Sequence, residues 1–199
     1  MKVKIKKEGK VKEFKLINSW SDVTLETWLK LIDFQTGTKT QEATESITLL
    51  TDIPKELVKE LALSDVSIIM SKIGEMQAKQ NTNLKRLIKI NGVEYGYHPD
   101  LSKITLGEYA DLESFIKNGI DKNLPELCAV LYRPVKEKKN NIYVIEAYDG
   151  DIRMRMEEMK KMTAEQVQSA LVFFYTFVEV LSKTMQLYLM DRLKEMKTQ

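Results

Sequence analysis

The sequence contains almost none of the residues that build metal, redox or disulfide sites. Its 199 residues include one cysteine, Cys128, and one histidine, His98. One chain therefore cannot form an internal disulfide, a Cys-Cys redox pair or a Cys/His zinc site, and a reducing compartment fits this composition. Only eight glycines and four prolines are present, which excludes collagen-like and low-complexity chains.

Long apolar runs are also missing. The most apolar stretch, residues 170–181, is twelve residues long and includes Glu179. A membrane-spanning helix needs roughly 20 apolar residues. The lysine-rich start is followed by no apolar segment of the kind found in signal peptides. We therefore expect a protein made in the cytosol that has no membrane association.

Positive and negative residues are nearly equal in number, but they are distributed unevenly along the chain. The chain is 43% apolar and 30% charged, and its net charge is +2. Seven lysines and two glutamates give residues 1–15 a charge of +5, which leaves −3 on the rest. Lys4, Lys6 and Lys12 form a candidate basic patch that can contact nucleic-acid phosphates. Lysines that protect an edge strand from aggregation are the favoured alternative.

Two segments carry the pattern of a β-hairpin. Apolar and charged residues alternate over residues 2–17 around Glu8 and Gly9, and a change of parity between Val11 and Phe14 predicts a bulge or a register change. Residues 86–97 alternate around Asn91 and Gly92, which is the strongest short-range signal for a hairpin.

A similar sequence pattern follows each predicted hairpin. Thr24 and Thr105 are each suited to cap a helix, and each helix is followed by an apolar run that ends in Pro54 or Pro134. The turn glycines lie 83 residues apart, the capping threonines 81 and the prolines 80. We infer a divergent duplication of a hairpin–helix–helix unit, covering about residues 1–80 and 86–135. Chance recurrence of common local motifs is the alternative.

The residue pattern in the last part of the chain predicts a charged loop at 137–141, a short strand at 142–147 and a helix at 153–162. The methionines of that helix suit either a core or an adaptable binding surface. They are Met154, Met156, Met159 and Met162. A final helix over about 163–196 would span about 50 Å, more than the width of a small domain. Its second half has a narrow apolar stripe that is a candidate partner-binding surface, although it can equally lie on its own domain. The stripe consists of Met185, Tyr188, Leu189 and Leu193.

These patterns together predict a mainly α, α+β fold. We expect a single compact domain over residues 1–199, with two small β-hairpins, pseudo-duplicated hairpin–helix–helix units and a long C-terminal helix. The chain offers no constellation of catalytic residues. His98 has only Asp100 nearby as an orienting partner, Cys128 lies in an apolar run, and the residues around Gly150 predict a turn rather than a calcium loop. We therefore predict that the protein is not an enzyme and has no cofactor or metal.

Four segments together carry a family resemblance. They are residues 19–25, 104–113, 131–134 and 170–174. In this order they resemble small, mostly helical proteins from the structural modules of tailed bacteriophages, such as tail assembly chaperones and virion-associated proteins. The resemblance implies a non-enzymatic role in virion or tail assembly, through contacts with other phage structural proteins or further copies of the chain. It implies a location in the virion or the host cytoplasm. The alternative function is a nucleic-acid-binding accessory protein that uses the lysine-rich hairpin.

Overall fold

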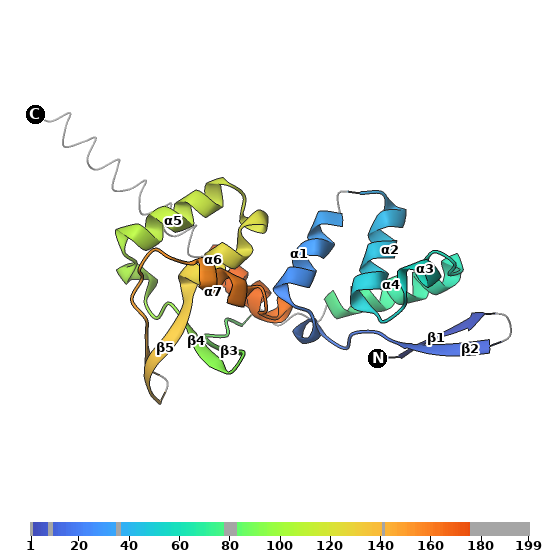
Figure 1. Ribbon diagram of the computed structural model, residues 1–199, viewed down its shortest axis with the longest axis horizontal. Coiled ribbons are helices and arrows are strands. Elements are labelled where there is room, and N and C mark those ends of the chain that lie inside the picture. The colour runs from blue at the N-terminus through green and yellow to red at the C-terminus, as the bar shows by residue number, and fades with distance from the viewer. Residues whose placement is uncertain (1, 8–9, 35–36, 78–82, 141, 176–199) are drawn as a thin grey trace, which may run out of the picture.

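The computed structural model describes residues 2–7, 10–34, 37–77, 83–140 and 142–175. The fold is α+β, which confirms the predicted class, and the described residues form two lobes side by side (Figure 1). The first lobe contains the N-terminal hairpin and helices α1 to α4, and the second contains strands β3 to β6 and helices α5 to α7. Each lobe has its own hydrophobic core.

The first lobe begins with the predicted hairpin. Strands β1 (Lys2–Lys7) and β2 (Lys10–Lys15) pair without interruption from Lys2 opposite Lys15 to Lys7 opposite Lys10. The predicted bulge or register change is therefore wrong. The change of parity arises because Val11 is an apolar residue on the solvent side, where it is 59% exposed.

Four helices follow this hairpin in the first lobe. They are α1 (Leu25–Phe34), α2 (Lys39–Leu50), α3 (Lys55–Val58) and α4 (Leu63–Gln77). The start of α2 is fixed by a capping box in which Thr38 and Gln41 satisfy each other's backbone amides. After α2 the chain returns beside the hairpin, where Ile17 N–H donates to Leu50 O at 3.1 Å.

The second lobe is built on a four-stranded antiparallel sheet. Its order is β3 (Leu87–Ile90), β4 (Val93–Tyr97), β5 (Tyr132–Lys139) and β6 (Ile142–Ile145). The predicted hairpin at Asn91 and Gly92 is present, with positive φ angles of 49° and 85° at these two residues. The predicted charged loop at 137–141 is wrong, because β5 continues to Lys139 and pairs with Ile142.

Helices α5 (Leu106–Lys117), α6 (Leu124–Leu131) and α7 (Arg153–Met159) complete the second lobe. Every residue of α6 except Glu126 is buried, so this short helix is the centre of the core. Beside it, the rings of Tyr97 and Tyr132 meet edge to face with centroids 5.1 Å apart. Gly96 lets the sheet pack closely, because a Cβ at this position would lie 2.5 Å from the ring of Tyr143.

Residues 81 positions apart occupy matching places in the two lobes. Each hairpin leads into a 3-10 turn, Trp20–Asp22 or Leu101–Lys103, and then into two helices. Helices α1 and α5 begin 81 residues apart, and α2 and α6 end 81 residues apart. The hydrogen bond from Ile17 N–H to Leu50 O has its counterpart in a 2.7 Å bond from His98 N–H to Leu131 O.

The two lobes are joined where the chain leaves α7. The ribbon after α7 lies against the start of α1 (Figure 1), and Thr24 and Thr163 form an isolated antiparallel bridge there. On either side of the bridge, Leu25 N–H donates to Met162 O and Ala164 N–H donates to Val23 O, both at 2.7 Å. We call this contact between residues 23–26 and 160–164 the junction.

The junction ties both cores together. Leu25 and Met162 belong to the core of the second lobe, whereas Val23 and Ala164 belong to the core of the first. Residues 164–175, which follow, are helical, as expected for the start of the predicted helix over 163–196. The remainder of that helix lies outside the described residues.

We predict that Leu25→Ala lowers the free energy of unfolding by about 2–5 kcal/mol, because Leu25 is 0% exposed and its removal leaves a cavity. The matched control is Leu106→Ala. Leu106 occupies the corresponding position at the start of α5 but is 82% exposed, so its truncation should cost no more than about 0.5 kcal/mol. Urea unfolding followed by circular dichroism measures both values. Equal losses in the two variants would contradict the role given to the junction.

Candidate functional site

The predicted partner-binding residues of the final helix, Met185, Tyr188, Leu189 and Leu193, lie outside the described residues, so they stay predictions. The described part of the same helix exposes large side chains. Val172 is 48% and Tyr175 51% exposed, whereas the ring of Phe173 packs edge to face on Tyr97 at 5.5 Å.

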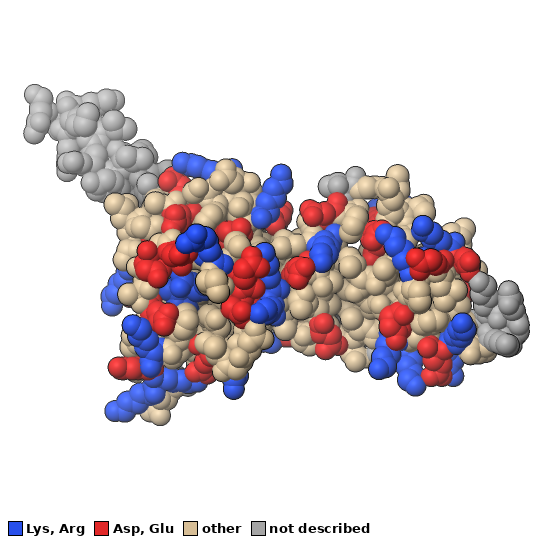
Figure 2. Space-filling model, in the orientation of Figure 1, with Lys and Arg blue, Asp and Glu red and all other residues tan. Residues whose placement is uncertain are grey.

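The predicted basic patch on the first hairpin is divided between two faces. Lys4 lies opposite Glu13, and its ammonium is 3.3 Å from the Glu13 carboxylate, which Lys2 also contacts at 2.9 Å. Lys12 lies opposite Ile5, hence on the other face of the hairpin. The side chain of Lys6 lies outside the described residues. Figure 2 shows acidic and basic side chains intermingled over this part of the surface.

The structure brings three charged or titratable side chains together inside the second lobe. His98 follows β4, Glu108 lies in the first turn of α5 and Arg133 lies in β5; they are 8%, 1% and 4% exposed. Glu108 Oε1 is 2.5 Å from the Arg133 guanidinium and 3.7 Å from His98 Nε2. We call these three residues the buried charge cluster.

A capping box places Glu108 in this cluster. Its second oxygen, Oε2, accepts hydrogen bonds from the Thr105 N–H at 2.7 Å and from the Thr105 hydroxyl at 2.6 Å. The Thr105 hydroxyl in turn caps α5. One carboxylate oxygen therefore fixes the start of α5, while the other holds the guanidinium of β5.

The protonation states follow from these contacts. Burial alone would raise the pKa of Glu108, but hydrogen bonds from Thr105 and the charge of Arg133 lower this pKa below its ordinary value. Burial lowers the pKa of His98, against the opposing effect of Glu108. The cluster is thus an ionised Glu108–Arg133 pair beside a neutral histidine. It anchors α5 to β5, and it extends to Tyr148, whose ring lies 5.7 Å from the Arg133 guanidinium and whose hydroxyl donates to Asp111.

Sequence reasoning singled out His98 but missed Arg133 and the pairing of Glu108. The available signal was an arginine within the apolar run of residues 127–134, where a charge requires a buried partner. The other residue of that run considered for chemistry, Cys128, is 3% exposed. Burial raises the pKa of Cys128 to about 12, so its thiol stays protonated at neutral pH.

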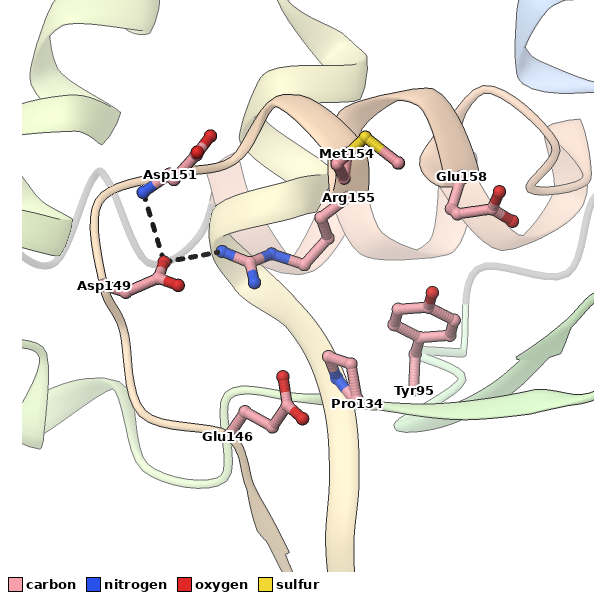
Figure 3. Close-up of a pocket in the computed structure, with 8 residues that line it drawn as sticks. All are labelled: Tyr95, Pro134, Glu146, Asp149, Asp151, Met154, Arg155 and Glu158. Atoms are coloured by element: carbon pink, nitrogen blue, oxygen red, sulfur yellow. Dashed lines mark hydrogen bonds and ion pairs between the residues drawn. The ribbon is translucent and has the colours of Figure 1, made fainter.

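An open pocket of about 380 Å³ lies between the sheet and α7 (Figure 3). Its lining residues are Tyr95, Pro134, Glu146, Asp149, Asp151, Met154, Arg155 and Glu158. Arg155 reaches across the pocket from α7, donates from Nε to Ala129 O at 2.6 Å and lies 3.9 Å from Asp149. Four carboxylates and one guanidinium give the lining a net negative charge, which suits a basic side chain of another molecule.

The pocket also explains the methionine cluster. Met159 and Met162 are 0% exposed and belong to the core, and Met156 packs against it. Met154 is 82% exposed at the rim of the pocket. Among the described residues, no group of three or more His, Cys, Asp or Glu side chains is placed to hold a metal ion.

Comparisons with known proteins found no match to a family model, a curated protein or a solved structure. Within the described ranges, no helix combines the length and the apolar character needed to cross a membrane.

We predict that the free energy of unfolding decreases as the pH falls below 6.5, the ordinary pKa of histidine. The folded state lowers the pKa of His98, so the unfolded chain binds a proton first, and the stability present at higher pH is lost. The loss is about 1.4 kcal/mol for each unit of pKa difference. Because His98 is the only histidine, urea unfolding of His98→Asn between about pH 7.5 and 5.5 should show a flatter profile. An unchanged slope would contradict this assignment.

We also predict that Arg133→Met destabilises the protein by about 3–5 kcal/mol, because it leaves the Glu108 charge buried without its partner. The same variant should raise the pKa of Glu108. Arg153→Met is the control, since the Arg153–Asp151 pair is largely exposed and should contribute little. Denaturant unfolding of both variants tests the prediction, which fails if the two changes are equal.

Proposed function

We propose that the protein is a non-enzymatic structural or assembly protein of a tailed bacteriophage, acting through protein–protein contacts in virion or tail assembly. One observation carries the proposal: large apolar side chains are exposed at defined positions on both lobes. Leu63, Leu106, Met154 and Ile142 are 86%, 82%, 82% and 77% exposed. Exposed apolar surface of this kind is typical of protein interaction sites, although single exposed residues are common in any protein.

The partners in this proposal are other phage structural proteins or further copies of the chain, in the virion or the host cytoplasm. Two features suit such contacts. The acid-lined pocket suits a basic side chain, and a mostly apolar groove of about 390 Å³ between α2 and α4 suits an apolar helix face. Nucleic-acid binding by the first hairpin is the weaker proposal, because Lys4 and Lys12 lie on different faces and Glu13 pairs with Lys2 and Lys4.

We further propose that the chain arose by duplication of a hairpin–helix–helix unit. The 81-residue offset supports this proposal because it holds for the 3-10 turns, the starts of α1 and α5, the ends of α2 and α6, and one tertiary hydrogen bond in each lobe. Chance recurrence of caps and hairpins would not produce a constant offset between tertiary contacts.

The proposed function predicts that the tagged protein, captured from phage-infected cells, brings phage structural proteins with it. Mass spectrometry of the captured material, compared with the tag alone, measures this enrichment. Mass spectrometry of purified virions then separates a lasting component from an assembly factor that leaves. Recovery of no phage structural protein would rule the proposal out.

A further inference from the structure

The same backbone arrangement occurs at the start of α1 and at the start of α5. Val23 and Ile104 each end a 3-10 turn, with their N–H groups bonded to Trp20 O and Leu101 O at 3.4 Å. Each is extended and is followed by a capping threonine and a leucine. We call residues 23–26 the first edge and residues 104–107 the second edge; they are 81 residues apart.

The first edge is filled by the chain itself. Residues 160–164 supply two carbonyls, from Lys160 and Met162, to the N–H groups of Glu26 and Leu25. They also supply the N–H of Ala164 to the carbonyl of Val23. As a result, Val23 is 3% exposed and Leu25 is 0% exposed.

The second edge has no such occupant among the described residues. No described group hydrogen-bonds to the N–H of Leu106 or the carbonyl of Ile104, which are the counterparts of the two groups bonded at 2.7 Å in the first edge. Leu106 is 82% exposed. Gly107 corresponds to Glu26, and a Cβ there would have only the Tyr148 ring near it, at 3.9 Å. A second backbone can therefore approach this edge.

We infer that the second edge is a docking site for a segment of a partner protein. That segment ends a helix, passes through a turn and forms one antiparallel bridge beside a large apolar side chain, as residues 160–164 do at the first edge. The inference deepens the proposed function, on which it rests for the existence of a protein partner. Residues 160–164 cannot fill both edges, because each of their bonding groups is already used at the first edge.

Charge distinguishes the occupants of the two edges. Asp22 directly precedes the first edge, and Glu26 lies in it. The segment received there contains Lys160, whose charge acts on Glu26, and Lys161; these two lysines also pair with Glu157 and Glu158. At the second edge the corresponding residues are Lys103 and Gly107, and Lys103 is exposed, 3.4 Å from Asp100. The partner segment should therefore carry acidic residues where the first occupant has lysines.

The probe is a synthetic peptide of residues 153–168 carrying Lys160→Glu and Lys161→Glu. Added to the isotopically labelled full chain, it should shift the amide signals of Leu106 and Gly107 saturably. Leu106→Asp should weaken binding about tenfold or more, because one buried anchor side chain contributes at least this much. Ile68→Asp is the control, since Ile68 is also an apolar helix residue, is 52% exposed and lies outside the surfaces proposed above; the affinity of this variant should stay within about twofold. The peptide with the original lysines should bind more weakly.

Several outcomes would overturn the inference. They are no saturable shift at residues 104–107, shifts confined to residues 23–26, and equal effects of Leu106→Asp and Ile68→Asp. Shifts at residues 104–107 that depend on protein concentration without peptide would overturn it too, because a second copy would then be the occupant. Failure of the docking site can be distinguished from failure of the proposed function. If phage proteins are captured but the peptide does not bind, only the docking site is ruled out. If the peptide binds but no phage protein is captured, only the phage role is ruled out.

Discussion

The antiparallel pairing of residues 23–25 with residues 162–164 is the interaction on which the arrangement of the two lobes depends. It joins positions that are far apart in sequence, and it sends Met162 into one core and Ala164 into the other. Each hydrogen bond adds only about 1 kcal/mol net, so the strength of the junction comes from the apolar side chains that it buries. Because the entropy of loop closure grows slowly with length, such a distant contact is not disfavoured much more than a near one. Neither core is complete without the other lobe's chain.

The two lobes hold the starts of α1 and α5 in different ways. In the first, Leu25 is buried under residues 160–164, and the positions matching Glu108 and Arg133 are Thr27 and Asp52. In the second, the Glu108–Arg133 pair fixes α5 from beneath. A buried ion pair gains little over an apolar contact in stability. Its consequence here is geometric: α5 is held in place while Leu106 stays exposed.

Local features of the fold were predictable from the sequence, and contacts between distant segments were not. Asn91 and Gly92 require positive φ, and Thr105 with Glu108 forms a capping box, so each is determined within a few residues. Strand β5 was missed because its charged residues Lys136 to Lys139 project from a ribbon with little burial on either face, which removes the alternating pattern. The Glu108–Arg133 pair was missed for another reason: its partners are on separate elements, and no spacing rule links them.

The unequal filling of two matching edges has a consequence for assembly. A chain whose two edges were both filled by its own segments would offer no such edge to another protein. A chain with both edges open would offer two related sites and could join indefinitely, as heterologous contacts do. Here residues 160–164 close the first edge, and Lys103 and Gly107 stand at the second where the first has Asp22 and Glu26. Under the proposed duplication and docking site, divergence between the two units gives the chain one directional attachment point, in place of a tendency to bind itself.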